Sequence, residues 1–219
     1  MVEKGYKAVV FDMDGVLLDT EKIYRLCWKE NGMSIGIPES EMNGICDRIA
    51  GGTKSHNAKV FQSVLGADFD YLPFREKTMN LFDEYIEEHG VDIKPGVVET
   101  FEYLKARDVK IALATSTDRK KAVYRLEKTG LLGYFDEMVY GDEIERGKPY
   151  PDIYLTACRK LDVEPHHAVG VEDSINGIIS ASDAGLYTVM VVDLIKPNEI
   201  TKSRAGQIYD NIIKICNLF

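Results

Sequence analysis

The sequence lacks the features that mark a membrane protein or a disulfide-stabilised secreted protein. No apolar run approaches the roughly 20 residues that a helix needs to span a bilayer, and the start of the chain has no apolar stretch of signal-peptide length. Only 4 cysteines occur in 219 residues; they lie far apart and form no CxxC pair. We therefore expect buried free thiols in a reducing compartment, and a cytoplasmic protein.

Positive charge is also scarce, because 27 lysines and arginines face 36 aspartates and glutamates, for a formal net charge of -9. This balance repels the phosphate backbones of nucleic acids and anionic lipid surfaces, so we expect neither a nucleic acid nor a membrane as a partner. The length allows one large domain, or a domain with a small insertion. We expect a monomer or a weak dimer. An anionic substrate would need local neutralising charge at its site.

Five short, nearly continuous apolar runs recur along the chain, and each leads into a polar turn and a helix-like stretch. This order is typical of a parallel sheet buried on both faces, and it predicts an α/β protein with a doubly wound sheet. The expected strands are 8–11, 109–114, 138–140, 168–171 and 188–192. Apolar residues at three- and four-residue spacing predict amphipathic crossover helices over 96–107, 119–131, 150–161 and 174–184.

The segment 21–90 interrupts this alternation of strands and helices. It contains no convincing strand and reads as successive amphipathic helices separated by glycine and proline. The sequence Lys94-Pro95-Gly96 would end this segment and allow the next helix to begin. We therefore predict an α/β core formed by 1–20 and 91–219, with a small α-helical domain inserted over 21–90.

Two aspartates, Asp12 and Asp14, follow the first predicted strand and precede Gly15. Ligands of open parallel sheets bind beyond the carboxyl ends of the strands, which is where both carboxylates fall. Carboxylates this close repel each other unless a cation or a shared proton neutralises them, and a hard divalent ion such as Mg²⁺ suits oxygen ligands. Gly15 permits a tight turn whose backbone N–H groups can bind an anion.

Three further strand ends carry polar groups. Thr115 and Ser116 follow the second strand, Lys148 lies in a Gly-Lys-Pro turn after the third, and Glu172 and Asp173 end the fourth. Each has an ordinary alternative explanation, since hydroxyls and Asp173 can cap helices and most lysines are solvated. However, a doubly wound sheet would bring all four strand ends to one crevice. Their coincidence favours a phosphate site with an oxygen-ligand metal.

In this order, the four motifs resemble those of the haloacid dehalogenase superfamily of hydrolases, and the resemblance covers essentially the whole chain. It is strongest to the β-phosphoglucomutase-like and phosphoglycolate-phosphatase-like group, whose helical cap is inserted after the first motif. The insertion deduced above from composition agrees with this. The motifs are Asp12-Met13-Asp14-Gly15-Val16, Ala114-Thr115-Ser116, Lys148-Pro149-Tyr150-Pro151-Asp152 and Glu172-Asp173-Ser174.

The resemblance implies covalent catalysis, in which Asp12 is the nucleophile that forms an aspartyl-phosphate. Asp14 would be the general acid that protonates the leaving oxygen and then the base that activates water. Asp12, the backbone carbonyl of Asp14, Glu172 and Asp173 would hold Mg²⁺, with Asp173 the better candidate for direct ligation. Whether Glu172 also binds the ion directly stays open at this point.

The same resemblance implies how the substrate is held. Thr115 and the Ser116 N–H would bind the phosphoryl group, while Lys148 would balance charge between nucleophile and phosphate. Arg119 could add a substrate contact, and Gly51 and Lys54 lie in the loop that matches the substrate loop of the cap. For that loop the alternative is that the glycines only join two helices and that Lys54 faces solvent.

We therefore predict an Mg²⁺-dependent phosphatase of small phosphorylated metabolites such as sugar phosphates. The main alternative is a sugar phosphomutase of the β-phosphoglucomutase type. Such mutases carry a histidine in the helix that enters the cap, where this chain has Tyr24, and Ala50 replaces a basic residue of the cap loop. A third possibility is a binding module that kept the fold and lost turnover, but every expected catalytic position is filled.

Overall fold

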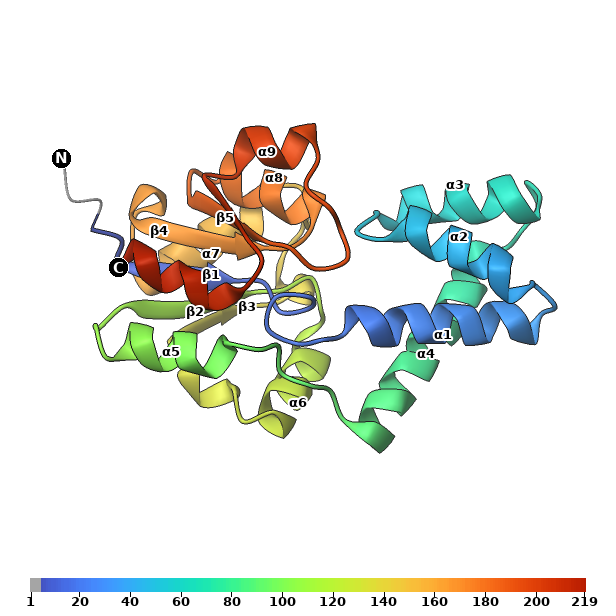
Figure 1. Cartoon of the computed structure of the whole chain (residues 1–219), viewed down its shortest axis with the longest axis horizontal. Helices are drawn as coiled ribbons and strands as arrows, with labels where there is room; N and C mark the ends of the chain where they lie inside the picture. Colours follow the sequence, from blue (N-terminus) through green and yellow to red (C-terminus); the bar gives the residue numbers. More distant parts are fainter. Residues whose placement is uncertain (1–4) are drawn as a thin grey trace. The chain divides into compact units, whose positions relative to one another are not determined.

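The structure, a computed structural model, describes residues 5–219 of the chain (Figure 1). The first four residues, which belong to the start expected to carry no signal sequence, lie outside the described residues. The chain folds as two compact units, a core unit of Met1–Asp19 with Asp92–Phe219, and a helical unit of Thr20–Val91. We had predicted the inserted segment over 21–90, so the two divisions differ by one residue at each end.

The core unit is built on a 6-stranded parallel sheet with the strand order β3-β2-β1-β4-β5-β6. This confirms the predicted α/β class with a doubly wound sheet. Short apolar strands fit this position because both faces of the central strands are covered, and β1 and β4 are buried throughout. The strands are β1 (Ala8–Phe11), β2 (Lys110–Ala114), β3 (Glu137–Val139), β4 (Ala168–Glu172), β5 (Tyr187–Val191) and β6 (Gln207–Tyr209).

The sheet has one strand more than the five expected, so that expectation was wrong. The additional strand, β6, is the three-residue edge strand Gln207–Tyr209, which pairs with β5. Gln207 is exposed and the other two residues are only half-buried. A strand this short, at a sheet edge and with a single aliphatic residue, has no periodic apolar pattern to reveal it.

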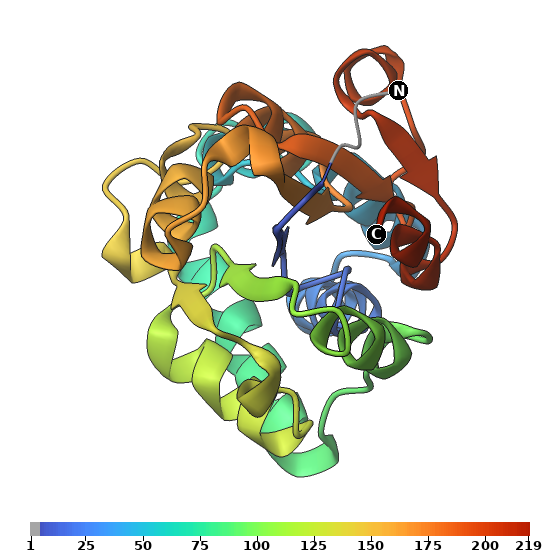
Figure 2. The ribbon, with the colours of Figure 1, turned by 90° about the vertical axis from the view of Figure 1, so that its left-hand side faces the viewer.

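Helices cover both faces of the sheet (Figure 2). On one face, α7 and α8 pack on alternate strand residues such as Val10 and Ala112, in a core that includes Ile153 and Ala157 of α7. On the opposite face, α5 packs on β2, and its Phe101 ring lies 5.2 Å from the Phe11 ring. The helices of this unit are α5 (Val97–Lys105), α6 (Arg119–Lys128), α7 (Asp152–Leu161), α8 (Ile175–Asp183) and α9 (Glu199–Arg204).

The register of the neighbouring strands β2, β1 and β4 aligns their carboxyl ends. Phe11, the last residue of β1, is level with Leu113 of β2 and Val171 of β4. The Asp12 N–H continues the ladder by donating to the Val171 carbonyl at 3.0 Å. Residues that follow these strands therefore emerge next to one another at one edge of the sheet, as expected for a ligand site in this architecture.

The helical unit is organised around aromatic side chains. Trp28 of α1 lies near Phe61 of α3 and Phe74 of α4, with ring centroids 5.3 and 5.8 Å away. Aromatic pairs at such distances contribute specific packing as well as buried apolar area. Met42 and Ile45 of α2 complete this core. The helices are α1 (Glu21–Ser34), α2 (Glu39–Ile49), α3 (Lys54–Leu65) and α4 (Tyr71–His89).

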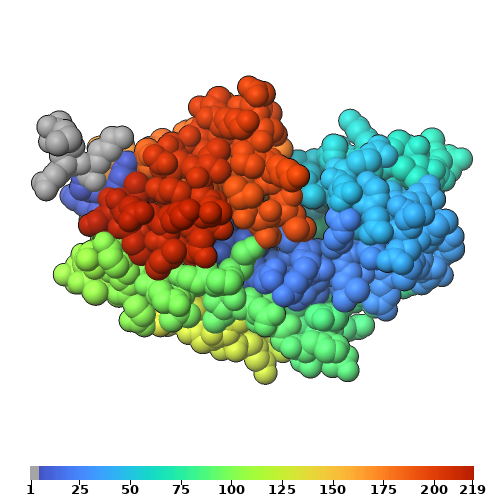
Figure 3. Space-filling view, viewed as in Figure 1, coloured from blue at the N-terminus to red at the C-terminus, as the bar shows by residue number. Residues whose placement is uncertain are grey.

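The C-terminal segment, drawn in orange and red, forms a continuous part of the core unit's surface (Figure 3). It includes α9 and the terminal 3-10 helix Ile212–Leu218, which packs on α5. All four cysteines are free thiols. Cys27, Cys46 and Cys158 are buried as expected, whereas Cys216 is only half-buried. Within residues 5–219, no helix has both the length and the apolar character required to cross a membrane.

Candidate active site

The turn after β1 presents Asp12 and Asp14 beyond the end of the sheet. Backbone hydrogen bonds close the turn, from the Leu17 N–H to the Met13 carbonyl at 2.9 Å and from the Gly15 N–H to the Leu18 carbonyl at 2.9 Å. Gly15 has φ +81°, a conformation that other residues rarely adopt.

Gly15 also allows Asp173 to approach the turn closely. A Cβ added at Gly15 would lie 2.2 Å from Asp173 Oδ2, so no larger residue fits without moving this carboxylate. The first and fourth motifs of the sequence are therefore in direct contact, and the absence of a side chain at one glycine makes that contact possible.

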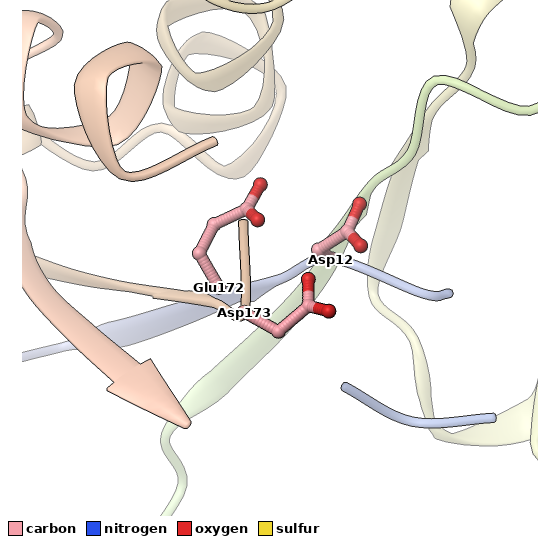
Figure 4. A group of neighbouring side chains, drawn as sticks. All are labelled: Asp12, Glu172 and Asp173. Carbon is pink, nitrogen blue, oxygen red and sulfur yellow. The ribbon is translucent and has the colours of Figure 1, made fainter. Parts of the chain in front are cut away.

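Three carboxylates converge at the ends of the two central strands (Figure 4). Asp12 follows β1, while Glu172 ends β4 and Asp173 follows it; each offers an oxygen that lies within 4.8 Å of the other two. All three residues are buried, with Glu172 fully so. Buried carboxylates require compensation by hydrogen bonds, by a cationic side chain or by a metal ion.

Lys148 provides part of this compensation. Its Nζ donates to Asp12 Oδ1 at 2.6 Å, to Glu172 Oε1 at 2.5 Å and to the Ala114 carbonyl at 2.9 Å. An ammonium group has three N–H donors, so each has a partner here. Burial acts to lower the pKa of Lys148, but the carboxylates of Asp12 and Glu172 outweigh it and raise the pKa above the usual range.

Glu172 is held on both of its oxygens. Oε1 accepts from Lys148 and from the Tyr154 hydroxyl at 2.8 Å, and Oε2 accepts from the Ser174 hydroxyl at 3.1 Å. Gly177 leaves room for this carboxylate, because a Cβ there would lie 1.8 Å from Glu172 Cδ. Ser174 also caps α8 by accepting from the Gly177 N–H at 3.0 Å. Glu172 is thus a fixed part of the site.

The electrostatics of the cluster leave Asp12 under-compensated. Burial raises the pKa of Asp12 to about 8; Lys148 opposes this effect, while Glu172 and Asp14 reinforce it. A carboxylate that serves as a nucleophile must be ionised near neutral pH. A divalent cation between Asp12 and Asp173 would favour the ionised form, because it would offset the neighbouring negative charges.

Asp14 lies apart from this cluster and has partners of its own. Its Oδ2 accepts from the Thr117 hydroxyl at 2.8 Å, and its Oδ1 lies 3.2 Å from Nη1 of Arg125 on α6. The Arg125 side chain is only 3% exposed. Asp12 and Asp14 are two residues apart in the sequence, yet their carboxylates contact different cations.

The hydroxyl motif after β2 lies at the same edge of the sheet. Thr115 is buried, and its hydroxyl accepts from the Thr117 N–H at 3.1 Å. Ser116 is exposed. The alternative role of these hydroxyls as a helix cap does not apply, because Asp118 is the N-cap residue of α6 and makes no side-chain cap bond. Gly141 allows close packing here, since a Cβ there would lie 2.2 Å from the Ser116 carbonyl oxygen.

The three remaining residues of the predicted site differ in their surroundings. Arg119 begins α6, and its exposed side chain pairs with Glu143 at 3.1 Å. Gly51 and Lys54 belong to the helical unit. Gly51 has φ +63°, and Lys54 is exposed in the first turn of α3. Among the residues that we predicted, the structure therefore groups Asp12, Asp14, Thr115, Ser116, Lys148, Glu172 and Asp173 around one edge of the sheet.

The donor set at this edge fits a hard divalent cation. Mg²⁺ prefers oxygen ligands and is usually held by one or two carboxylates together with water or phosphate oxygens. Asp12 and Asp173 supply such oxygens within 4.8 Å of each other. The Asp14 carboxylate is not part of this group, so only its main chain could serve as a ligand, as the resemblance implies.

Two of the site's contacts that escaped prediction from the sequence come from helices. Arg125 and Tyr154 occupy buried positions of amphipathic helices, where the periodic pattern favours an apolar residue. In α6, Arg125 shares its buried stripe with Ala122 and Leu126. A charged residue on an apolar stripe was the available signal, because a buried arginine requires an anionic partner.

Comparisons with known proteins agree with this architecture. The haloacid dehalogenase-like hydrolase family matches residues 6–185. A phosphorylated carbohydrates phosphatase of Thermotoga maritima is 36% identical over 214 residues, which cover 89% of this chain and 96% of that protein. A beta-phosphoglucomutase of Bacillus subtilis is 31% identical over 195 residues, covering 84% of this chain and 83% of that protein.

A solved structure shares the fold over nearly its whole length. A haloacid dehalogenase-like protein of unknown function from Agrobacterium tumefaciens superposes with a TM-score of 0.82 at 25% identity, covering 98% of this chain and 97% of that chain. The paired aspartates after β1, the lysine that contacts one of them and the acids at the end of β4 are the features that the sequence motifs predicted. With residues 6–185 matched, the chain belongs to the haloacid dehalogenase-like family of hydrolases.

Proposed function

We propose that this protein is an Mg²⁺-dependent phosphatase that hydrolyses small phosphorylated metabolites, with phosphorylated carbohydrates as the substrate class. The observation that carries the proposal is the arrangement of two aspartates with separate partners. Asp12 contacts Lys148 at the centre of the carboxylate cluster, whereas Asp14 is held outside it by Thr117 and Arg125. One carboxylate is thus suited to attack and the other to proton transfer.

In the first step, an oxygen of Asp12 forms a bond to phosphorus while the bond from phosphorus to the substrate oxygen breaks. Asp14 gives its proton to the leaving oxygen, so that an alcohol departs and Asp12 carries the phosphoryl group. In the second step, water gives a proton to Asp14 and its oxygen bonds to phosphorus. The bond from phosphorus to Asp12 then breaks, which releases inorganic phosphate and restores both aspartates.

Lys148 and the hydroxyl motif would hold the phosphoryl group during these steps. Lys148 lies 2.6 Å from Asp12 Oδ1, so its charge is placed next to the atom that attacks. Thr115 and the Ser116 N–H follow the neighbouring strand and would bind phosphoryl oxygens. In the helical unit, Gly51 and Lys54 would contact the rest of the substrate, and Arg119 would add a contact from α6.

Asp12, Asp173 and the Asp14 carbonyl would hold the Mg²⁺ ion. When bound, the ion supplies positive charge that shields the anionic phosphate from an anionic nucleophile and stabilises equatorial charge on phosphorus. Glu172 belongs to the same group of carboxylates, and among the described residues its Oε2 accepts only the Ser174 hydroxyl, so this oxygen could also bind the ion. We propose that Glu172 fixes Lys148 beside Asp12.

A sugar phosphomutase is the second candidate, and the likeness to the Bacillus subtilis beta-phosphoglucomutase favours it. Tyr24 argues for the phosphatase. It stands where those mutases carry a histidine, and its ring stacks on Phe82 at 3.8 Å, inside the helical unit. A phenol has a pKa near 10 and does not replace an imidazole as a proton carrier near neutral pH.

The experiment that tests the proposal is a phosphate-release assay with Mg²⁺ over a panel of sugar phosphates, phosphoglycolate and nucleotides. A coupled assay in parallel measures glucose 6-phosphate formed from β-glucose 1-phosphate. We expect free phosphate from a narrow set of carbohydrate phosphates, and its loss when EDTA removes the metal. Isomerised sugar phosphate with little free phosphate would establish the mutase instead, and no turnover of any substrate would refute both.

A further inference from the structure

A buried arginine on α6 belongs to none of the four sequence motifs. Arg125 is 2% exposed, and it lies on the stripe of α6 that also buries Ala122 and Leu126. Burying a guanidinium group among apolar residues is costly unless it is paired and hydrogen-bonded. An apolar residue at this position would pack at lower cost, so the arginine calls for an explanation by what it contacts.

Arg125 contacts the carboxylate of Asp14. Its Nη1 lies 3.2 Å from Asp14 Oδ1, and the Thr117 hydroxyl donates to Asp14 Oδ2 at 2.8 Å. The two donors come from α6 and from the loop before it, and each binds a different oxygen, so they fix both the position and the rotation of the carboxylate. An ionised carboxylate has about four lone-pair sites, so each oxygen keeps one for a proton or a water molecule.

We infer that Arg125, assisted by Thr117, positions Asp14 for proton transfer to the leaving oxygen and from water. This inference rests on the proposed role of Asp14 as acid and base. Asp14 stands in a turn beyond the end of β1, where no strand fixes its side chain. A displacement of about 1 Å in a catalytic group can slow a reaction on the order of 100-fold, so an anchor from the neighbouring helix has a direct effect on rate.

The need for a correctly positioned Asp14 should depend on the leaving group of the substrate. Departure of an alkyl oxygen requires a proton, whereas the 4-nitrophenolate ion leaves without one. The first chemical step therefore needs Asp14 for an alkyl phosphate and not for 4-nitrophenyl phosphate, while the second step needs Asp14 for both. A variant that misplaces Asp14 should release a rapid burst of nitrophenolate and then turn over slowly.

The experiment compares Arg125→Gln, Arg125→Lys and Thr117→Val with the wild type and with Asp14→Asn, in full-length protein with Mg²⁺. Leu126→Ala is the matched control, because Leu126 is the buried neighbour of Arg125 on α6 and belongs to no motif. Burst and steady-state rates with 4-nitrophenyl phosphate and kcat with a sugar phosphate are measured for each. Melting temperatures identify loss of stability, and the lysine and valine variants keep the test open if Arg125→Gln does not fold.

We expect Arg125→Gln to lower kcat for the sugar phosphate by about 10-fold or more, and the burst rate by less than about threefold, with smaller effects in the same direction for Arg125→Lys and Thr117→Val. KM should change little. Leu126→Ala should have a lower melting temperature, without a greater loss of kcat for the sugar phosphate than of the burst rate. If Arg125→Gln lowers the burst rate with 4-nitrophenyl phosphate as much as kcat for the sugar phosphate, or if Leu126→Ala shows the same selective loss, Arg125 has only a structural role.

Asp14→Asn separates this inference from the proposed function. If Asp14→Asn shows the burst and the Arg125 and Thr117 variants do not, the role of Asp14 stands and the positioning role of Arg125 is refuted. If Asp14→Asn turns over the sugar phosphate like the wild type, then Asp14 is not the acid, and the proposed function and this inference both fail at that residue.

Discussion

In the core unit, the buried side chains include the charged groups Asp12, Arg125, Glu172 and Asp173. In the helical unit, the buried polar side chains among the described residues are the neutral groups of Thr20, Asn31 and Thr78. Buried charges are costly and persist where a fold compensates them. The core unit therefore buries charged side chains around one site, whereas the helical unit is stabilised by packing.

The ion pairs of the two units differ in the same way. Arg25 and Asp47 of the helical unit pair at 2.6 Å, with side chains 34% and 68% exposed. Lys148 and Asp12 of the core unit also pair at 2.6 Å, with side chains only 7% and 11% exposed. Water screens the first pair, so it adds little to stability. The second pair acts in a low-dielectric environment, where its effect on chemistry is large.

The largest expected difference between the units comes from adding one methyl group to a glycine in each. Gly177→Ala would place a Cβ 1.8 Å from Glu172 Cδ. Both oxygens of this carboxylate are hydrogen-bonded, so it cannot move aside freely. We expect a loss of about 1–3 kcal/mol in stability from overpacking, and a fall in kcat/KM on the order of 100-fold as Lys148 and Asp12 shift.

Gly44→Ala is the matched substitution in the helical unit. Gly44 lies within α2, and an added Cβ has no neighbour within 4 Å. We expect a gain of about 0.5–1 kcal/mol, because alanine is the better helix former, and unchanged turnover. Thermal unfolding and steady-state kinetics measure both variants. Full activity in Gly177→Ala would show that Glu172 need not be held in place.

A substitution in the core of the helical unit should lower stability and leave turnover unchanged. Asn31 is fully buried in the helical unit, and its Nδ2 donates to the Phe74 carbonyl and to the Thr78 hydroxyl, both at 2.8 Å. Asn31→Ala should lower the free energy of unfolding by about 1–3 kcal/mol. Turnover of 4-nitrophenyl phosphate below the melting temperature should stay within about twofold of the wild type.

Asp47→Ala is the control for Asn31→Ala, since it removes a mostly exposed partner in the same unit and should change stability little. Denaturant unfolding and kinetics on the same preparations would decide between the outcomes. A large loss of turnover in folded Asn31→Ala would contradict the separation of packing from chemistry.

The third prediction tests whether the helical unit contributes to recognition. Lys54 is exposed at the start of α3. If it contacts the substrate as proposed, Lys54→Ala raises KM severalfold or shifts the preference among sugar phosphates, without abolishing hydrolysis of 4-nitrophenyl phosphate. Lys59→Ala, an exposed lysine of the same helix, should leave the profile unchanged. An identical substrate profile for both variants would remove Lys54 from the site.

The smallest expected effect uses one cysteine from each unit. Cys27 and Cys158 are both buried, and burial raises the pKa of each thiol to about 11. Alkylation of either thiol therefore requires the region around it to open. Cys158 lies on α7, and Tyr154 of the same helix donates a hydrogen bond to Glu172. Mg²⁺ should slow alkylation of Cys158 a fewfold and leave Cys27 unchanged. Mass spectrometry of the labelled peptides measures both, and equal protection would contradict a metal site confined to the core.

Much of the core unit followed from the sequence because its signals are local. Continuous apolar runs gave β1, β2 and β4, and the residues directly after them formed the predicted motifs. The edge strand β6 was missed because its three residues are partly exposed and pair with only one neighbour. Edge strands depend on the sheet beside them, which a single sequence does not display.

The sequence predicted the site as polar residues at strand ends. It did not predict the side chains that contact Asp14 and Glu172. Thr117, Arg125 and Tyr154 reach Asp14 or Glu172 from 103, 111 and 18 positions away in the sequence. Such contacts depend on how helices pack on the sheet. The family resemblance already separated the roles of Asp12 and Asp14, and the structure adds the different partners of the two carboxylates.

The central claim is that Asp12 carries the phosphoryl group during turnover. Asp14→Asn lacks the base of the second step, so the phosphorylated enzyme should accumulate when this variant is mixed with 4-nitrophenyl phosphate and Mg²⁺ and quenched in acid. Mass spectrometry should place one phosphoryl group on Asp12, and the double variant with Asp12→Asn should carry none. A phosphoryl group on another residue, or none in Asp14→Asn despite a burst of nitrophenolate, would contradict the account.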